Sequence, residues 1–232
     1  MNKRASYVAL ALVAGLLAGG CARKPVQEAG TDHPADPATA PASVAPGVET
    51  EPGLQDDGND VAFWLHPDDA GKSLVLVSGG TAGLEVFGLD GKRAGRYADG
   101  EFDFVDVIPG FARAGAIGPL VVGYDRQGGG LVTLVVEPAT ATLRRVSART
   151  LDTGGEVTGL CTYRSALTGN HYAFAAVDGG NLQQWELFAR GDQVDGRLVR
   201  TVPIGSGAGY CAVDAVAGEV YVAEETVGIW RL

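Results

Sequence analysis

Short apolar runs separated by glycine-rich turns make up most of the chain after residue 54. Four of these runs resemble one another: SLVLVSGG at 73–80, PLVVGYDR at 119–126, HYAFAAVDGG at 171–180 and GEVYVAEE at 218–225. The runs recur at similar intervals: 46 residues from Leu74 to Leu120, 52 from Leu120 to Tyr172 and 48 from Tyr172 to Val220. Runs of this length, rich in Val, Leu and aromatic residues, predict β-strands, and their regular spacing predicts a structural repeat.

Each repeat contains further strand-like segments around the shared run. One segment precedes it, as VAFWL, FVDVI, TGLCTY and YCAVDA, and one follows it, as GLEVFGLDG, LVTLVVEPA, NLQQWELFA and VGIWRL. The first three repeats add another segment, as KRAGRYA, LRRVSAR and GRLVRTV. Four antiparallel strands in about 45 to 52 residues is the repeat of a β-propeller blade. We therefore expect an all-β fold, a β-propeller of four-stranded antiparallel blades. A β-sandwich also has many short strands, but the regular spacing favours the propeller.

The fourth repeat reaches Leu232 after its third strand, so the chain holds about 3.75 blades. A blade without its outer strand leaves unpaired backbone groups at the edge of its sheet. Two explanations stay open. Either the propeller domain, residues 55–232, is C-terminally incomplete because a longer protein has been cut here, or the missing strands come from elsewhere.

The first twenty residues have the pattern of an export signal. Two basic residues precede an apolar run from Tyr7 to Leu17, and small residues lead to Cys21. An apolar stretch this short, with these flanks, is typical of a secretory signal and not of a membrane span. LLAGGC resembles the bacterial lipoprotein signal, which implies that residues 1–20 are removed and Cys21 is lipidated. The protein would then be exported and lipid-anchored to the cell membrane or outer membrane, facing the periplasm or the cell surface. An ordinary cleaved signal is the alternative.

Composition separates a tether from the folded domain. Residues 21–54 are mainly Ala, Pro, Thr, Glu and Asp, and such a segment cannot bury enough apolar surface to offset its ordering entropy. We expect a disordered tether there and one core in residues 55–232. The formal net charge of −10 argues against nucleic acid or an anionic membrane face as partner and permits a cation-binding protein.

Four segments carry a family resemblance: NDVAFWLHP at 59–67, GLEVFGLDGK at 83–92, EVTGLCTYRS at 156–165 and VYVAEETVGIW at 220–230. They resemble, in order and spacing, segments of the bacterial β-propeller phytases, or alkaline phytases. The resemblance runs from about Asp57 to Leu232 and implies six blades, of which this chain carries about two thirds. It also implies calcium-dependent hydrolysis of phosphate from myo-inositol hexakisphosphate (phytate). Calcium ions and basic side chains bind the substrate phosphates, and a calcium-activated water attacks phosphorus.

The resemblance assigns roles to individual residues. It implies calcium ligands at Asp60, Asp106, Asp214, Glu224 and Glu225, and catalytic roles for Arg126 and Glu225. Other positions depart from the family pattern: Asn59 and Phe104 replace an Asp and an Asn, and Asp178 replaces a Lys. A carboxylate in place of an ammonium group repels a phosphate. We therefore expect hydrolysis to be weak or lost in this chain alone.

The family's two-domain members suggest an alternative function. Their N-terminal phytase-like domain is incomplete and lacks much of the catalytic set. On this alternative the chain is a non-catalytic propeller domain that binds a cation or a phosphorylated small molecule and assists a second, complete phytase domain. Phosphoryl transfer needs metal and cationic groups around the phosphoryl group, and here one matching Arg remains.

Some candidate residues also have a plain structural interpretation. Asp60 and Asp106 are 46 residues apart, one blade period, and each is expected to begin the first strand of its blade. Their carboxylates would then lie near the central channel, where they share a cation or accept hydrogen bonds from turn amides. Glu224 and Glu225 alternate across a strand, so only one can face inward, and the resemblance favours Glu225 as the ligand.

Arg126 either binds phosphate or pairs with Asp125 or Asp106. His66 precedes a proline at a strand end and is expected to cap the chain there instead of binding metal. Cys161 and Cys211 are 50 residues apart on presumed inner strands, and export makes a disulfide chemically possible. Equivalent positions in neighbouring blades tend to be too far apart for a disulfide, so we expect two buried free thiols.

Overall fold

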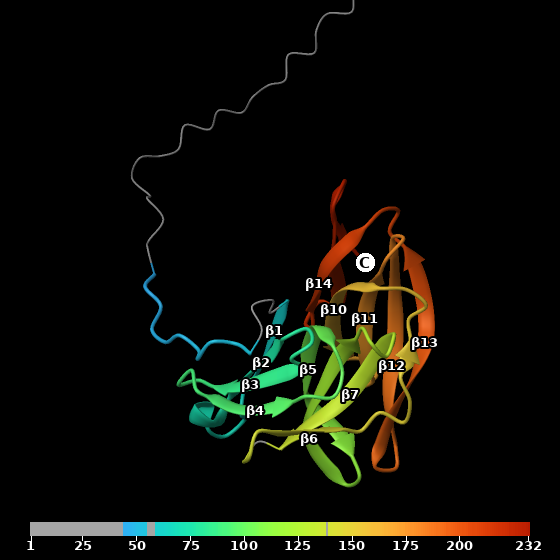
Figure 1. Ribbon diagram of the computed structural model, residues 1–232. Helices are drawn as coiled ribbons and strands as arrows, with labels where there is room; N and C mark the ends of the chain where they lie inside the picture. Colours follow the sequence, from blue (N-terminus) through green and yellow to red (C-terminus); the bar gives the residue numbers. More distant parts are fainter. Residues whose placement is uncertain (1–43, 55–58, 138) are drawn as a thin grey trace, which may run out of the picture. The chain divides into compact units, whose positions relative to one another are not determined.

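A computed structural model describes residues 44–54, 59–137 and 139–232 of the protein. Within these ranges, strands β1 to β16 form four antiparallel sheets, accompanied by the short 3-10 helix η1 (Ala70–Lys72). The sheets follow one another along the chain and are arranged as blades of a β-propeller (Figure 1). The all-β fold and the blade repeat predicted from the sequence are confirmed.

Each blade is a meander in which consecutive strands pair. Blade 1 contains β1 (Asp60–Trp64), β2 (Leu74–Ser78), β3 (Leu84–Gly88) and β4 (Arg93–Tyr97). Blade 2 contains β5 (Phe102–Arg113), β6 (Ala116–Asp125), β7 (Gly130–Glu137) and β8 (Thr142–Arg145), with the short β9 (Leu151–Asp152) paired to β7. Blade 3 contains β10 (Val157–Arg164), β11 (His171–Val177), β12 (Asn181–Arg190) and β13 (Gln193–Pro203). Blade 4 contains β14 (Ala208–Asp214), β15 (Glu219–Glu224) and β16 (Gly228–Arg231). Its three strands match the sequence prediction.

The first strands of neighbouring blades lie side by side: β1 packs against β5, β5 against β10, and β10 against β14. Three apolar clusters fill the spaces between blades 1 and 2, between blades 2 and 3, and between blades 3 and 4. Because side chains alternate along a strand, Val121 of β6 packs toward blade 1 and Val122 packs toward blade 3. Strands buried on both faces explain the nearly continuous apolar runs of the sequence.

The segment before blade 1 is bound to it. The Glu51 amide donates to the Gly91 carbonyl at 2.8 Å, and the Leu54 amide donates to Glu85 Oε2 at 3.1 Å. Arg93 joins the same network, because its Nε donates to Glu85 Oε1 at 2.7 Å. Gly91 has a φ of +79°, and a Cβ there would meet the Glu49 carbonyl oxygen at 2.1 Å, so only glycine allows this approach. The tether expected to run to residue 54 therefore overlaps with the folded domain, because charged groups of blade 1 bind its backbone.

Cys161 and Cys211 form a disulfide, so the expectation of two free thiols is wrong. Their Cα atoms are 5.7 Å apart, within the range that a disulfide requires. The physical reason is their position: Cys161 lies on β10 and Cys211 on β14, and first strands of neighbouring blades converge near the propeller axis. The disulfide links blades 3 and 4 across this contact.

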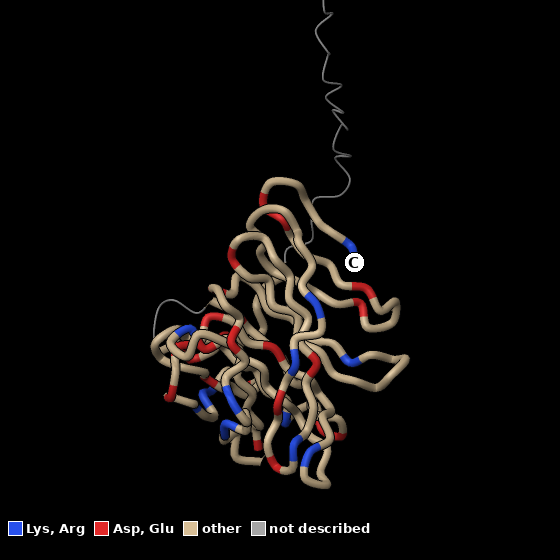
Figure 2. The backbone as a smooth tube through the Cα atoms, turned by 90° about the vertical axis from the view of Figure 1, so that its right-hand side faces the viewer, with Lys and Arg blue, Asp and Glu red and all other residues tan. Residues whose placement is uncertain are grey.

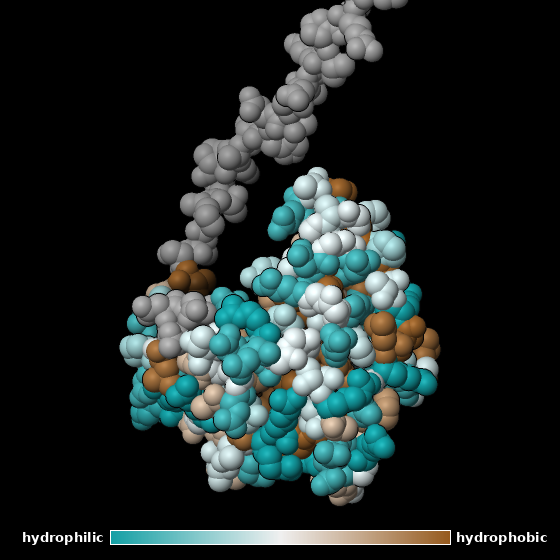
Figure 3. Space-filling model, turned by 45° about the vertical axis from the view of Figure 1, so that its right-hand side comes forward, coloured by the Kyte–Doolittle hydropathy of each residue, from teal (hydrophilic) through white to brown (hydrophobic). Residues whose placement is uncertain are grey.

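The surface is mixed in character. Acidic and basic residues are interspersed over the strands and turns (Figure 2). On the face seen in Figure 3, hydrophilic and intermediate residues dominate, and apolar residues show as small separate patches. Within the described ranges, no helix has the length and hydropathy needed to cross a membrane. The expected signal peptide at 1–20 and lipidated Cys21 lie outside those ranges.

Candidate functional site

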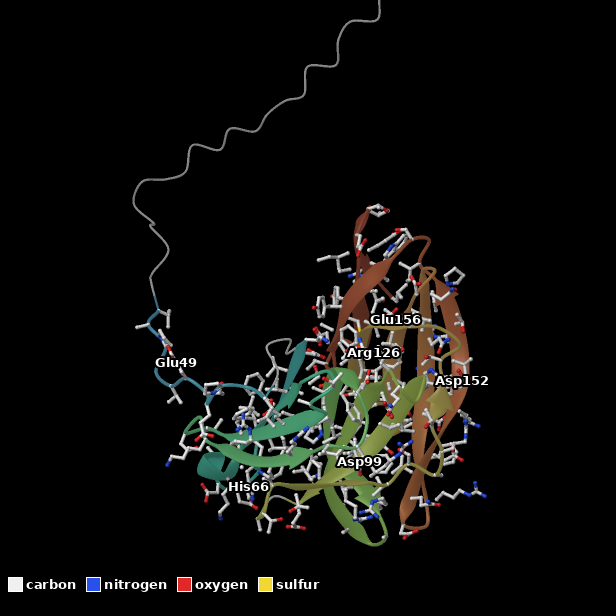
Figure 4. All side chains as sticks on the ribbon, viewed as in Figure 1. Glu49, His66, Asp99, Arg126, Asp152 and Glu156 are labelled. Atoms are coloured by element: carbon white, nitrogen blue, oxygen red, sulfur yellow. A yellow bond between two sulfur atoms is a disulfide. The ribbon has the colours of Figure 1, made fainter. Side chains whose placement is uncertain are left out.

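A pocket of about 320 Å³ lies where the first strands of the four blades begin. Its wall is made by residues at or near the starts of β1, β5, β10 and β14 and by the turn after β6: Asn59, Asp103, Phe104, Arg126, Glu156, Val157, Thr158 and Tyr210. Arg126 and Glu156 lie together between blades 2 and 3 (Figure 4). The repeat thus brings residues that are far apart in sequence to one end of the propeller.

Arg126 is the cationic side chain of this pocket. Its Nη2 lies 3.0 Å from Glu101 Oε2, and its Nη1 lies 3.6 Å from Asp103 Oδ2. The hydrogen bond to Glu101 and the charge of Asp103 raise the pKa of Arg126, so the guanidinium stays charged. Its side chain is 46% exposed, which leaves it accessible to a ligand. The sequence analysis named Asp125 or Asp106 as possible ion-pair partners of Arg126. The observed partners are Glu101 and Asp103, because the turn after β6 directs Arg126 toward the start of β5.

The carboxylates around Arg126 oppose anion binding. Asp103 is buried, with 5% exposed surface, and its Oδ1 also accepts a hydrogen bond from Asn59 Nδ2 at 3.1 Å. Glu156 lines the same pocket and is exposed. Among the described lining residues, one guanidinium therefore faces two carboxylates. A phosphate group would enter with one attractive contact and no second cation to share its charge.

Asp60 and Asp106 connect neighbouring blades. Asp60 Oδ2 accepts a hydrogen bond from the Val105 amide of blade 2 at 3.0 Å. Asp106 Oδ2 accepts hydrogen bonds from the Thr162 amide and hydroxyl of blade 3, at 2.7 and 2.8 Å. Asp60 begins β1 as predicted, but Asp106 lies inside β5, which already starts at Phe102. The sequence prediction of its position is wrong because β5 extends further toward the pocket than β1 does.

Burial raises the pKa of both carboxyl groups above the ordinary value for Asp. For Asp60 the nearby charge of Asp106 raises it further, while the Val105 and Val61 amides act in the opposite direction. For Asp106 the hydrogen bonds from Thr162 and Val107 partly offset burial. Burial is thus the main cause for both groups, and each carboxylate is held by its own set of hydrogen bonds. Neither lines the Arg126 pocket.

We expect Asp106→Asn to destabilise the protein by about 1–3 kcal/mol, because an amide nitrogen replaces an acceptor of the Thr162 or Val107 hydrogen bonds. The effect depends on pH. Since the folded-state pKa of Asp106 is raised, its contribution to stability is complete below the unfolded pKa of about 3.9 and is lost as pH rises through the folded value. The deficit of the variant should be largest near pH 4 and should shrink toward neutral pH.

Urea unfolding of both proteins over this pH range, in EDTA, measures the difference. Asp99→Asn, which changes an exposed carboxylate, is the control and should leave stability almost unchanged. A deficit that grows with rising pH would contradict the assigned direction of the pKa shift.

Glu224 is the inward-facing member of the pair in blade 4. It is 5% exposed, and its two carboxylate oxygens accept hydrogen bonds from the Ser206 hydroxyl and the Trp230 indole N–H. These hydrogen bonds lower its pKa and keep it ionised. Glu225 is exposed, and its amide donates to the Gly207 carbonyl. The prediction that only one of the two faces inward is confirmed, and the geometry gives that position to Glu224, whereas the resemblance favoured Glu225 as the ligand.

Two other candidates have local structural roles. Asp214 ends β14, and its Oδ1 accepts hydrogen bonds from the Val216 and Ala217 amides, both at 2.9 Å. His66 Nδ1 accepts hydrogen bonds from the Asp68 and Asp69 amides at 3.2 and 3.1 Å. The expected capping role of His66 is therefore confirmed.

The described residues do not fit a calcium cage. Such a cage needs six to eight oxygen ligands around one point. Among the described residues, no three Asp, Glu, His or Cys side chains gather in an arrangement that could hold a metal ion. The oxygens of Asp60 and Asp106 accept backbone hydrogen bonds, and those of Glu224 accept hydrogen bonds from Ser206 and Trp230. The predicted ligands lie in separate local networks.

Sequence reasoning missed Asp103, Glu101 and Glu156 as members of the site. A signal was present for two of them. Glu156 opens EVTGLCTYRS, one of the four segments that carry the family resemblance, and Asp103 lies between the aromatic residues Phe102 and Phe104. A carboxylate between large apolar residues at a strand start is a candidate for a buried charge that requires a partner.

Comparison with known proteins adds an independent finding. A family model described as Phytase matches residues 7–232. The 3-phytase of Bacillus subtilis (strain 168) is 28% identical over 200 residues, which cover 79% of this chain and 50% of that protein. The chain thus spans about half the length of this curated relative. A chain in the crystal structure of BBS1N in complex with ARL6DN, soaked with lead, superimposes with a TM-score of 0.46 at 12% identity, covering 77% of this chain and 56% of that one.

Proposed function

The chain belongs to the phytase family, and on that premise we propose that its propeller domain binds phytate or a related phosphorylated small molecule through the Arg126 pocket, with weak or no hydrolysis of its own. The carrying observation is the position of Arg126. It is a charged, half-exposed guanidinium in a pocket formed by all four blades. Arg is well suited to phosphate because its planar fork can donate two parallel hydrogen bonds.

The same pocket explains why we infer weak hydrolysis. Phosphoryl transfer requires several positive charges around the phosphoryl group. Here Glu101 and Asp103 already pair with Arg126, and the described carboxylates do not form a metal cage. In this proposal the domain holds a phosphorylated molecule and assists a complete phytase domain elsewhere.

Calcium-dependent hydrolysis of phosphomonoesters is the second candidate function. It is favoured by the family and by the position of Asp60 and Asp106 on neighbouring inner strands, where burial and, to a smaller extent, the charge of Asp106 raise the pKa of Asp60. A cation near this pair would lower that pKa. Binding of Ca²⁺ would need Asp60 and Asp106 to give up backbone hydrogen bonds that now join the blades.

Titration calorimetry with phytate, using the full chain and the Arg126→Gln variant, tests the proposed binding. We expect the affinity to fall about tenfold or more in the variant, because a charged hydrogen-bond donor is lost. Arg190→Gln is the matched control. Arg190 also pairs with a carboxylate, Asp195 at 3.6 Å, but it lies at the end of β12 and not in the pocket. The affinity of the Arg190→Gln variant for phytate should therefore equal that of the wild type. Equal affinity in all three proteins would refute the role of Arg126.

Phosphate release from phytate in millimolar calcium distinguishes the two functions. Binding without release supports the proposal. Release that disappears in Asp60→Ala would instead establish hydrolysis. Calcium that raises the melting temperature without any release would show a cation site separate from catalysis.

We also propose that the protein is exported and anchored by a lipid on Cys21. The disulfide between Cys161 and Cys211 supports export, because disulfides persist mainly in oxidising compartments. Mass spectrometry of the mature N-terminus is the test. An acylated Cys21 is the expected result, whereas a free N-terminus after residue 20 would indicate an ordinary cleaved signal.

A further inference from the structure

A second pocket, of about 670 Å³, lies away from the Arg126 site. It forms where β6 and β7 separate: their pairing ends at Leu120 and Val135, and the β5–β6 and β7–β8 hairpins diverge beyond that pair. The end of β1 adds Trp64 and His66 to the wall. Figure 4 shows His66 well away from Arg126 and Glu156, so the two pockets lie in different regions of the propeller.

The wall of this pocket is largely apolar. Its apolar members come from three strands and from the β1 exit: Trp64, Pro109, Phe111, Pro119, Leu120 and Val136. A volume of several hundred cubic ångströms, apolar walls and a few polar groups are typical of small-molecule sites. The pocket is therefore large enough for an organic molecule and poorly suited to a fully hydrated ion.

Two guanidinium groups supply the positive charge at this pocket. Arg113 is half-buried, and its Nη1 donates to the Asp192 backbone carbonyl at 2.6 Å. Within the described part of the chain, neither Arg113 nor Arg144 has a carboxylate oxygen within 4.0 Å. Asp68 and Glu137 also line the pocket, but both are exposed, so water and salt screen them more strongly than they screen Arg113. The less screened charge is positive, which favours an anionic head group.

The Trp64 indole provides an independent observation. Trp64 is 3% exposed, and its Nε1 is the one buried side-chain nitrogen or oxygen without a hydrogen-bond partner among the described residues. Buried indole N–H groups usually have an acceptor, and an unpaired one requires an explanation. Trp64 is one of the residues that line the pocket. An oxygen-bearing ligand would satisfy the donor.

We propose that this pocket, between the β1 exit and the diverging hairpins of blade 2, binds a small organic anion with an apolar body, such as a medium-chain carboxylate. The apolar body packs against Phe111, Leu120 and Val136, and the carboxylate lies near Arg113. This site is separate from the Arg126 pocket, so it stands whether or not phytate binds there.

Titration calorimetry of the full chain with octanoate tests the site, with octylamine and acetate as matched probes. Gly118→Leu is the blocking variant. Gly118 lines the pocket, and a Cβ built there meets no atom within 4 Å, so the first atom of a larger side chain enters open space. Gly118→Ala is its control. An unchanged melting temperature in both variants shows that they fold.

We expect octanoate to bind, octylamine to bind at least tenfold more weakly because it carries the wrong charge, and acetate to bind undetectably because it lacks the apolar body. Gly118→Leu should weaken octanoate binding at least tenfold and Gly118→Ala less than twofold. Arg113→Gln should weaken it about fivefold or more. The proposal is overturned if octanoate does not bind, if it binds Gly118→Leu as well as wild type, or if octylamine binds equally well.

Discussion

Replacing both Cys161 and Cys211 by Ala is expected to lower the free energy of unfolding by about 2–5 kcal/mol. The disulfide closes a loop between residues 50 positions apart, and without it the unfolded chain gains conformational freedom. In the folded protein the bond also joins β10 to β14, so blade 4 loses its covalent link to blade 3. Blade 4 has three strands in the described structure and should open first. Urea denaturation measures the global loss, and hydrogen exchange measures the local opening.

Each single substitution, Cys161→Ala or Cys211→Ala, breaks the same bond and should cost nearly as much as the double substitution. Wild type in dithiothreitol should unfold at a similar urea concentration. Alkylation of the unfolded, unreduced protein followed by mass spectrometry should leave Cys161 and Cys211 unlabelled. Labelling of both, or an unchanged urea midpoint in the double variant, would contradict the disulfide.

This disulfide shows where sequence reasoning reached its limit. The 50-residue interval places Cys161 and Cys211 on equivalent strands of neighbouring blades, which is correct. The distance between equivalent positions depends on how far each strand lies from the propeller axis. First strands converge, so the Cα separation falls to 5.7 Å, and a periodic pattern carries no information about this convergence.

The strands themselves could be predicted because their signals are local. Apolar runs buried on both faces, with turns between them, identify the meander of each blade without knowledge of its neighbours. The candidate site depends on contacts between blades. Asp106 was recognised as a first-strand carboxylate, but its Thr162 partner lies one blade away. Likewise, strand alternation shows that one of Glu224 and Glu225 faces inward, and only the packing of Ser206 and Trp230 decides which.

The contacts of Arg126 also join residues that are distant in the sequence. Glu101 lies directly before β5 and Asp103 lies within it, whereas Arg126 follows β6. The pairing of β5 with β6 brings them together. A family resemblance predicts the position of a residue more reliably than it predicts the charged groups around that residue. The charge environment of Arg126 therefore depends on Glu101 and Asp103, two carboxylates that the family motifs do not include.

Arg93→Ala is expected to destabilise the protein by about 3–5 kcal/mol, because it leaves the carboxylate of Glu85 buried without its cation. The Glu85 side chain is 2% exposed, and Arg93 Nε lies 2.7 Å from its Oε1. Arg93 also donates to the Pro52 carbonyl at 2.5 Å and lies over the Phe87 ring, 5.4 Å from its centroid. Its loss should therefore also release the segment before blade 1.

Urea denaturation and limited proteolysis of residues 46–54 measure the two parts of this effect. Arg190→Ala is the control, because Arg190 has a 72% exposed side chain and its pair with Asp195 should contribute less than about 1 kcal/mol. The double variant Glu85→Leu with Arg93→Leu removes both charges and should recover much of the global loss, since apolar residues of similar size can replace a buried ion pair. It should not recover protection of residues 46–54, because the Pro52 carbonyl loses Arg93 in both variants and the Leu54 amide also loses Glu85 in the double variant. A double variant as unstable as Arg93→Ala would show that packing of the Arg93 side chain on Phe87, and not the buried charge of Glu85, accounts for the effect.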